Sequence, residues 1–342
     1  MHNFKILIMN GSRKKILNLK KFENMINDNK SIYLDLNEIE EIVIYYFHEA
    51  NFNMAEKAIE FANQIFPSSI NISILESEIL MQKSKGSEAY NLIDKCLDIN
   101  SENFDLMFQK AKILNKLRKY TDSNAVLEKL NKLNDTISLV DDLLLKNYMN
   151  LDKYVKSIKI AKRLISSFPE DKKYMDKLVS CFRLSKRENE AIRFLNEFLS
   201  KNPYNQNAWF EIGKLYFEKK MIKESIASHE FSIICDELFS PSYIELAKIY
   251  EYNLNFNKAI YYYEILKSLG SESSFSLYRL SVCYEKIGSY DKVIGCLNEI
   301  ISKDPLYEKA WISIAKHYLR KNDHDKALEN LNKALNIIAN NY

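Results

Sequence analysis

Aromatic and small residues recur in two columns along the chain, at every 34th position. One column holds a ring in seven of nine positions and leucine in the other two: Tyr46, Leu80, Leu114, Tyr148, Phe182, Tyr216, Tyr250, Tyr284 and Tyr318. A second column, broken only by Val293, holds Ala55, Ala89, Ser123, Ser157, Ala191, Ser225, Ala259 and Ala327. A small residue lets two helices approach closely, and a ring fills the space between them. The pattern therefore predicts tandem helical repeats.

Each period is predicted to contain two amphipathic helices. From about Gln206 to Lys219, the apolar residues Trp209, Ile212 and Tyr216 lie three or four positions apart and share one helix face. A second helix is predicted from about Ile222. Neither helix can bury its apolar stripe alone, so each hairpin has to pack on its neighbours.

Proline marks the same period. Pro67, Pro169, Pro203 and Pro305 follow one another at intervals of 102, 34 and 102 positions, so all four occupy one position of the repeat. Proline lacks a backbone N–H and has a fixed φ, which suits the turn after a second helix. The tetratricopeptide repeat has this period, about 34 residues.

The residues within the period resemble the tetratricopeptide repeat family. The stretch from Trp209 to Tyr216 is similar to the family signature W-x-x-L-G-x-x-Y, and the stretch from Trp311 to Tyr318 looks like a second copy. Ala259 with Tyr263 follows the A-x-x-x-F half of the signature. The resemblance implies an all-α, right-handed superhelical solenoid of nine tandem 34-residue helix-turn-helix repeats, as in bacterial cytoplasmic proteins built entirely of such repeats.

The domain organisation follows from counting in steps of 34. Residues 1–35 are predicted to form an N-terminal leader with a capping helix. The repeats are expected at 36–69, 70–103, 104–137, 138–171, 172–205, 206–239, 240–273, 274–307 and 308–341.

The leader carries an apolar stripe at helical spacing, made of Ile16, Leu19, Phe22, Met25 and Ile26. We expect this helix to cover the exposed edge of the first repeat, and Asp35 with Glu38 predicts a capping box at the start of that repeat. The basic side of the leader leaves contact with acidic partners or lipid headgroups as an alternative.

Composition agrees with a helical chain and argues against β-rich folds and nucleic-acid-binding proteins. Only six glycines and five prolines occur in 342 residues, too few to turn the many short strands of a sandwich or barrel. Residues 1–35 carry a net charge of +4, so the rest of the chain is at −1 within a total of +3. Nucleic-acid binding is not expected, because it requires a concentrated basic surface.

No stretch has the length of a membrane span, and the N-terminus does not resemble a secretory signal. The five cysteines (96, 181, 235, 283 and 296) form no CxxC pair, which suits a reducing, cytoplasmic location. The five histidines are scattered, and the glycines are isolated. We therefore predict no catalytic residue, metal site or cofactor, and we expect His229 to be a packed core residue.

The family resemblance implies that the concave groove, lined by the first helix of each repeat, holds a ligand. The ninth position of the repeat is lysine five times, at Lys112, Lys146, Lys214, Lys248 and Lys316. Aromatic residues lie one turn earlier at Phe108 and Phe210, with Tyr278 in the same position of repeat eight. This combination favours an extended peptide with acidic and hydrophobic residues. The alternative is a solvated face on which Asp142, Asp176, Glu211 and Glu245 pair with the lysines.

The predicted function is therefore a protein-protein interaction scaffold or adaptor that binds a peptide or protein partner in this groove. A ligand-responsive regulator that binds a small peptide is one alternative. A homo-oligomeric structural protein is another, associating through Leu328, Leu331, Leu335 and Ile338 on the last predicted helix. The pattern leaves the oligomeric state open.

Overall fold

The structure is a computed structural model that describes residues 12–28, 33–133 and 137–340. These residues form 19 helices and no strand, which confirms the all-α prediction. The helices are α2 (Ser12–Asp28), α3 (Leu36–His48), α4 (Phe52–Ile65), α5 (Ile70–Gln82), α6 (Gly86–Ile99), α7 (Phe104–Lys116), α8 (Tyr120–Leu133), α9 (Ile137–Asn150), α10 (Tyr154–Ser167), α11 (Lys172–Leu184), α12 (Glu188–Lys201), α13 (Gln206–Glu218), α14 (Ile222–Cys235), α15 (Ser240–Tyr252), α16 (Phe256–Ser268), α17 (Ser274–Lys286), α18 (Tyr290–Lys303), α19 (Glu308–Arg320) and α20 (His324–Asn340).

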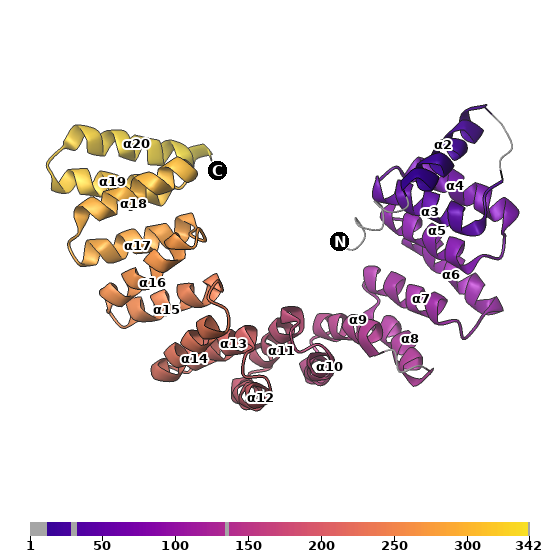
Figure 1. Ribbon diagram of the computed structural model, residues 1–342, viewed down its shortest axis with the longest axis horizontal. Coiled ribbons are helices and arrows are strands. Elements are labelled where there is room, and N and C mark those ends of the chain that lie inside the picture. Colours follow the sequence, from indigo (N-terminus) through magenta and orange to yellow (C-terminus); the bar gives the residue numbers. More distant parts are fainter. Residues whose placement is uncertain (1–11, 29–32, 134–136, 341–342) are drawn as a thin grey trace. The chain divides into compact units, whose positions relative to one another are not determined.

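The helices pair into successive hairpins, from α3 with α4 to α19 with α20 (Figure 1). Eight of the first helices begin at the same position of the repeat, while α9 begins at Ile137, one residue before that position. The division into a leader at 1–35 and nine repeats over 36–341 stays our proposal. The right-handed superhelical twist also stays a prediction.

The chain divides into two compact units, Met1–Ile160 and Ala161–Tyr342, and the boundary falls inside α10. A repeat array makes such a division possible, because each hairpin contacts only its neighbours in the chain.

Each hairpin turns from its first helix to its second through a residue with left-handed backbone conformation. These residues recur every 34 positions, with φ between 55° and 77°: Ala50, Ser84, Arg118, Asp152, Lys186, Lys220, Leu254, Gly288 and Asn322. The next N–H bonds back to a carbonyl five residues earlier, as from Asn255 to Tyr250 at 2.8 Å, which closes a Schellman turn. Only one of the nine residues is glycine, so eight turns hold a conformation that costs an ordinary residue free energy.

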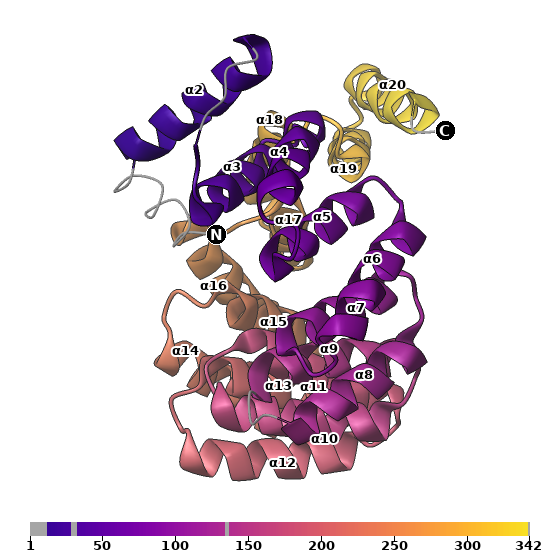
Figure 2. The ribbon, with the colours of Figure 1, turned by 90° about the vertical axis from the view of Figure 1, so that its right-hand side faces the viewer.

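In the first unit, α2 packs against the first hairpin (Figure 2). The ring of Phe22 is fully buried, and its centroid lies 6.3 Å from those of Tyr46 and Phe61. The Tyr46 hydroxyl donates to Glu23 Oε1 at 2.9 Å, which ties α2 to α3. The capping box is confirmed, because the N–H of Glu38 donates to Asp35 and the N–H of Asp35 donates to Glu38.

In the second unit, the small and aromatic columns meet in the core. Ala259 on α16 is fully buried in one cluster with Leu246, Ala247 and Tyr250 of α15 and with Tyr284 of α17. The small side chain therefore lies where α16 approaches its neighbours, as the repeat pattern predicts.

Replacing Ala259 with tryptophan is expected to lower the free energy of unfolding by about 1 to 3 kcal/mol, because the indole cannot fit a filled core without displacing its neighbours. Chemical denaturation followed by circular dichroism measures the change. The matched control is Ala227→Trp on the exposed side of α14, which should cost far less. Equal stability of the two variants would contradict the packing described here.

Candidate functional site

The first helices of the second unit form a pocket where α11 and α13 lie side by side. Its volume is about 200 Å³. The helical repeat places four residues of α11 on one face, and three residues of α13 close the other side. The lining residues are Lys172, Asp176, Ser180, Arg183, Phe210, Glu211 and Lys214.

A buried carboxylate organises the charges of this pocket. Glu211 is only 4% exposed, and its Oε1 accepts a hydrogen bond from Lys214 Nζ at 2.8 Å. Its Oε2 lies 3.6 Å from Nη1 of Arg183, whose Nη2 lies 3.1 Å from Glu218. The three basic side chains of the lining are balanced by Asp176, Glu211 and Glu218, but Lys172 makes no ion pair with the residues that the structure describes. An anionic group is therefore the favoured ligand.

An aromatic ring stands beside these charges. The centroid of Phe210 lies 5.5 Å from that of Phe239 and 5.6 Å from that of His229, both in edge-on contact. Lys214 Nζ lies 5.0 Å from the centre of the Phe210 ring, within range of a cation–π contact. The pocket thus presents an apolar surface next to ammonium groups.

His229 lies behind Phe210 and is fully buried, which confirms the prediction of a core histidine. Among the described residues, neither ring nitrogen has a hydrogen-bond partner. Burial, followed by the charge of Lys214, lowers the pKa of His229 to about 3, so the ring is neutral near pH 7. A Cβ at position 213 would lie 2.8 Å from His229 Nε2, which explains the glycine at that position.

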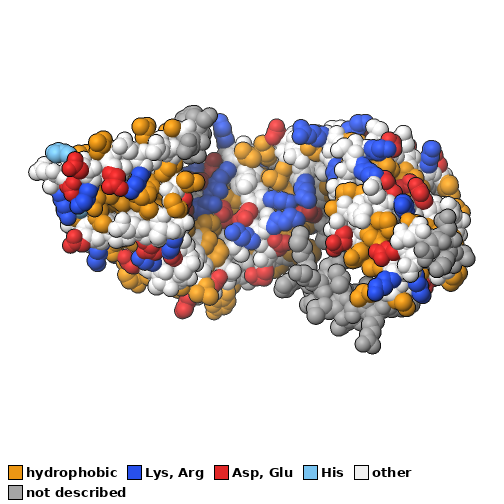
Figure 3. Space-filling view, turned by 90° about the horizontal axis from the view of Figure 1, so that it is seen from above, with side chains coloured by type: hydrophobic (Ala, Val, Ile, Leu, Met, Phe, Trp, Pro, Cys, Tyr) orange, Lys and Arg blue, Asp and Glu red, His pale blue; other side chains and the backbone are white. Residues whose placement is uncertain are grey.

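None of the other predicted lysines lines this pocket. In the first unit, Lys112 Nζ lies 2.7 Å from Glu78, and Lys146 Nζ lies 3.5 Å from Asp142. In the second unit, Lys248 Nζ lies 2.8 Å from Glu245. These pairs support the alternative of a partly neutralised face, and basic and acidic side chains lie next to one another on the surface in Figure 3.

Lys316 differs from the other four predicted lysines. It is exposed, and within the part of the chain that the structure describes it makes no ion pair. Among the predicted aromatic residues, Phe108 stacks on Phe104 at 6.0 Å between ring centres, and Tyr278 lies 5.9 Å from Tyr307. Of the eight predicted site residues, only Phe210 and Lys214 meet in the pocket.

Sequence reasoning missed Lys172 and Arg183, the two basic residues that α11 contributes. They lie 11 positions apart, three turns of helix, and therefore share a face with Asp176 and Ser180. This spacing is a signal that could have identified them. The signal appears only when all residues on that face of the helix are compared, because neither Lys172 nor Arg183 occupies the ninth position of its repeat.

Residues 12–28, 33–133 and 137–340 contain neither a candidate metal site nor a candidate membrane span. No group of three or more His, Cys, Asp or Glu side chains is arranged to hold a metal ion. No helix in these ranges is both long enough and apolar enough to cross a membrane.

The tetratricopeptide repeat family model matches residues 308–341, the segment that holds α19 and α20. Its turn residue, Asn322, has the same left-handed backbone conformation as the equivalent residues of the hairpins before it, and α19 begins 34 residues after α17. Residues 308–341 thus match a tetratricopeptide repeat, and the helical hairpins before them recur with a period of 34 residues. No curated protein matches its sequence.

Several solved structures are similar to this chain in fold. A crystal structure of MamA is 23% identical with a TM-score of 0.45, over 48% of this chain and 96% of that one. YrrB, described as a TPR protein with an unusual peptide-binding site, is 19% identical with a TM-score of 0.43, over 52% and 91%. The APC/C hetero-tetramer Cut9-Hcn1 is matched at 14% identity and a TM-score of 0.42, over 89% and 61%. Likenesses at this level carry no inference about a ligand.

Proposed function

We propose that the protein is a non-enzymatic scaffold or adaptor that holds a peptide segment of a partner protein against its first helices, in the pocket between α11 and α13. The observation that carries the proposal is the placement of Phe210 beside Lys172, Arg183 and Lys214 in one depression. Repeat solenoids bind partners along extended surfaces of this kind, and the family in general serves as scaffolds.

The chemistry of the pocket favours one class of peptide. An acidic side chain would pair with the ammonium group of Lys172, and a neighbouring hydrophobic side chain would cover Phe210. The pocket needs neither a cofactor nor a nucleic acid, and a cytoplasmic location is part of the proposal. Contacts of a bound peptide with Lys248, Lys316 and Tyr278 of the second unit are part of it as well, and peptide contacts of Lys112, Lys146 and Phe108 in the first unit stay a separate proposal.

The double substitution Lys172→Gln/Lys214→Gln is expected to weaken capture of acidic partners while leaving helix content unchanged. Glutamine keeps a donor for Glu211 but removes the charge that attracts a carboxylate. Pull-down from the native cell with mass spectrometry identifies the partners. Their retention should also fall as salt rises from about 50 to about 300 mM, since screening weakens exposed charge pairs.

Two further variants separate charge from packing. Phe210→Ala should lower affinity by about 1 to 2 kcal/mol with little change in salt dependence, because it removes an apolar contact. The matched control, Lys223→Gln/Lys321→Gln, removes two exposed lysines outside the pocket. If the pocket variants and this control retain the same partners, the peptide is bound elsewhere.

One observation favours the homo-oligomeric alternative. Leu328, Leu331, Leu335 and Ile338 lie along one face of α20 with exposed fractions of 60%, 39%, 62% and 39%. A second copy packed on this face would bury them. A protein that sediments as a monomer at high concentration would exclude this alternative. The ligand-responsive regulator uses the same pocket as the adaptor and is distinguished by a change in partner affinity on peptide binding.

A further inference from the structure

An aromatic side chain at the fourth position of the first helix makes the same contact in three repeats of the second unit. The indole N–H of Trp209 donates to the carbonyl of Pro203 at 2.7 Å, and that of Trp311 donates to Pro305 at 2.9 Å. In the repeat that follows Trp209, the hydroxyl of Tyr243 donates to the carbonyl of Glu237 at 3.0 Å. All three acceptors occupy one position of the repeat, in the turn before the first helix.

The ring of Trp209 is held on its other side by the second helix of its own repeat. It stacks on Phe231 of α14 with 4.8 Å between ring centres. In the two repeats that contain these tryptophans, one position of the second helix holds a small residue, Ser232 or Ala334. The chain therefore contains a repeated slot for a ring, bounded by a turn carbonyl and the face of a second helix.

In the repeat of α11 and α12 the fourth position of the first helix supplies no ring to this slot. The fourth position is Met175, which is almost fully buried, and Phe198 takes the place of the small residue. Methionine has no N–H or O–H to donate to the turn carbonyl. Beside Pro169, the equivalent turn residue, the surface opens into a cavity of about 340 Å³.

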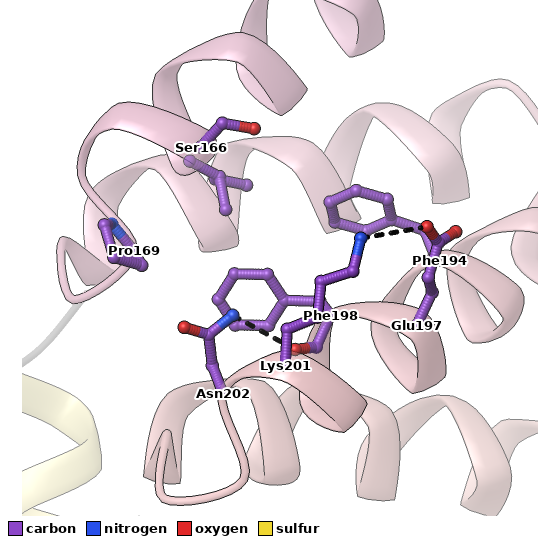
Figure 4. A pocket seen from close by; sticks show the side chains of 8 residues that line it. Ser166, Pro169, Phe194, Glu197, Phe198, Lys201 and Asn202 are labelled. Carbon is purple, nitrogen blue, oxygen red and sulfur yellow. Dashed lines mark hydrogen bonds and ion pairs between the residues drawn. The ribbon is translucent and has the colours of Figure 1, made fainter.

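The walls of the cavity suit an aromatic ring (Figure 4). Pro169 lies on one side, the rings of Phe194 and Phe198 lie on the other, and Ile165 also lines the cavity. The carbonyl of Pro169 accepts one hydrogen bond, from Asn205 Nδ2 at 2.9 Å, so a second lone pair remains for another donor. Glu197 and Lys201 form the rim, with 3.5 Å between Oε1 and Nζ.

We propose that this cavity between α10 and α12 binds a tryptophan side chain of a partner peptide. The indole would lie between Pro169 and Phe194, and its N–H would donate to the Pro169 carbonyl as Trp209 donates to Pro203. Phe194 would supply the ring contact that Phe231 gives Trp209, because Glu197 occupies the position equivalent to Phe231. The two rim side chains are both more than 70% exposed, so they can turn toward the backbone of the peptide at little cost. The site uses second helices and is independent of the pocket between α11 and α13.

The test uses N-acetyl-L-tryptophanamide as the probe and two-dimensional NMR of the full chain labelled with nitrogen-15. We expect saturable shifts of the amide signals of Phe194 and Lys201, with a dissociation constant in the millimolar range because only one side chain is buried. N-acetyl-L-leucinamide, which lacks the ring and its N–H, should bind at least about tenfold more weakly.

Two variants decide the location of the site. Met175→Trp/Phe198→Ser introduces the pair that the next repeat carries at Trp209 and Ser232, so the new indole should fill the cavity and abolish binding. Phe194→Ala removes one wall and should weaken binding at least about tenfold. Phe217→Ala, a ring that pairs with Tyr252 and does not line the cavity, is the control and should bind as the parent does.

Several results would overturn the proposal. These are shifts confined to residues elsewhere, equal binding of the leucine probe, or full binding by the filled variant. Circular dichroism checks that the filled variant is folded. If it is not, Phe194→Ala alone decides, and unchanged binding by that variant refutes the site. None of these outcomes depends on the peptide pocket, so the two proposals fail separately.

Discussion

Replacing Glu251 with alanine is expected to lower the free energy of unfolding by about 3 kcal/mol. The carboxylate is almost fully buried on α15, where it accepts the Tyr263 hydroxyl at 2.6 Å and an N–H of Arg279 at 3.2 Å. A second bond from Arg279 reaches its other oxygen. Alanine would leave a buried hydroxyl and a half-buried guanidinium without their acceptor, and desolvated donors are costly when unpaired.

Chemical denaturation of the parent and three variants measures this effect. Glu251→Gln keeps an acceptor for Tyr263 but loses the charge, so it should fall between the parent and Glu251→Ala. Glu329→Ala removes the partner of Lys333 in an exposed ion pair and should cost far less, because solvent screens exposed pairs. A loss no larger for Glu251→Ala than for Glu329→Ala would show that the buried network does not stabilise the second unit.

Lowering the pH below 6.5 is expected to destabilise the protein through His229. The folded pKa is about 3 and the ordinary value is 6.5, so the unfolded chain binds the proton more readily than the folded chain. The contribution of His229 is therefore fully present above pH 6.5 and falls by about 1.4 kcal/mol for each pH unit between 6.5 and 3. At pH 4.5 the loss would reach about 3 kcal/mol.

The matched variant is His229→Leu, because leucine occupies the same position of the repeat at Leu195 and Leu297. Other groups titrate in this range, including His317 and Glu299, whose pKa values are also lowered. These groups contribute to both proteins, so the difference between parent and variant isolates His229. We expect that difference to grow as pH falls from 6.5. If the free energies of unfolding of parent and variant fall in parallel as the pH is lowered, protonation of His229 does not destabilise the folded protein.

The repeat architecture could be predicted because periodic contacts leave a periodic sequence. Tyr250 and Tyr284 occupy the same position of successive repeats and are buried in one core cluster, with Ala259 between them in the chain. A solenoid packs each repeat in nearly the same way, so a constraint at one position recurs at the next. The all-helical secondary structure and the starting residue of most first helices follow from that repetition.

The left-handed turn residues could not be predicted in the same way. Leu254 and Lys186 carry positive φ values of 58° and 56°, although neither type favours that conformation. The geometry is imposed by the two helices that each turn joins and by the backbone hydrogen bond that closes it. The residue type at this position is therefore free to vary, and only Gly288 marks a left-handed turn in the sequence.

For the candidate sites, the sequence by itself determined that Phe210 and Lys214 share one helix face, because a spacing of four is one turn. Only the tertiary structure decided that Lys172 and Arg183 join them, since contacts between α11 and α13 depend on how two helices pack. The same holds for the cavity beside Pro169. Met175 and Phe198 are both ordinary apolar residues in the sequence, and the space they leave is set by the volumes of side chains from two hairpins.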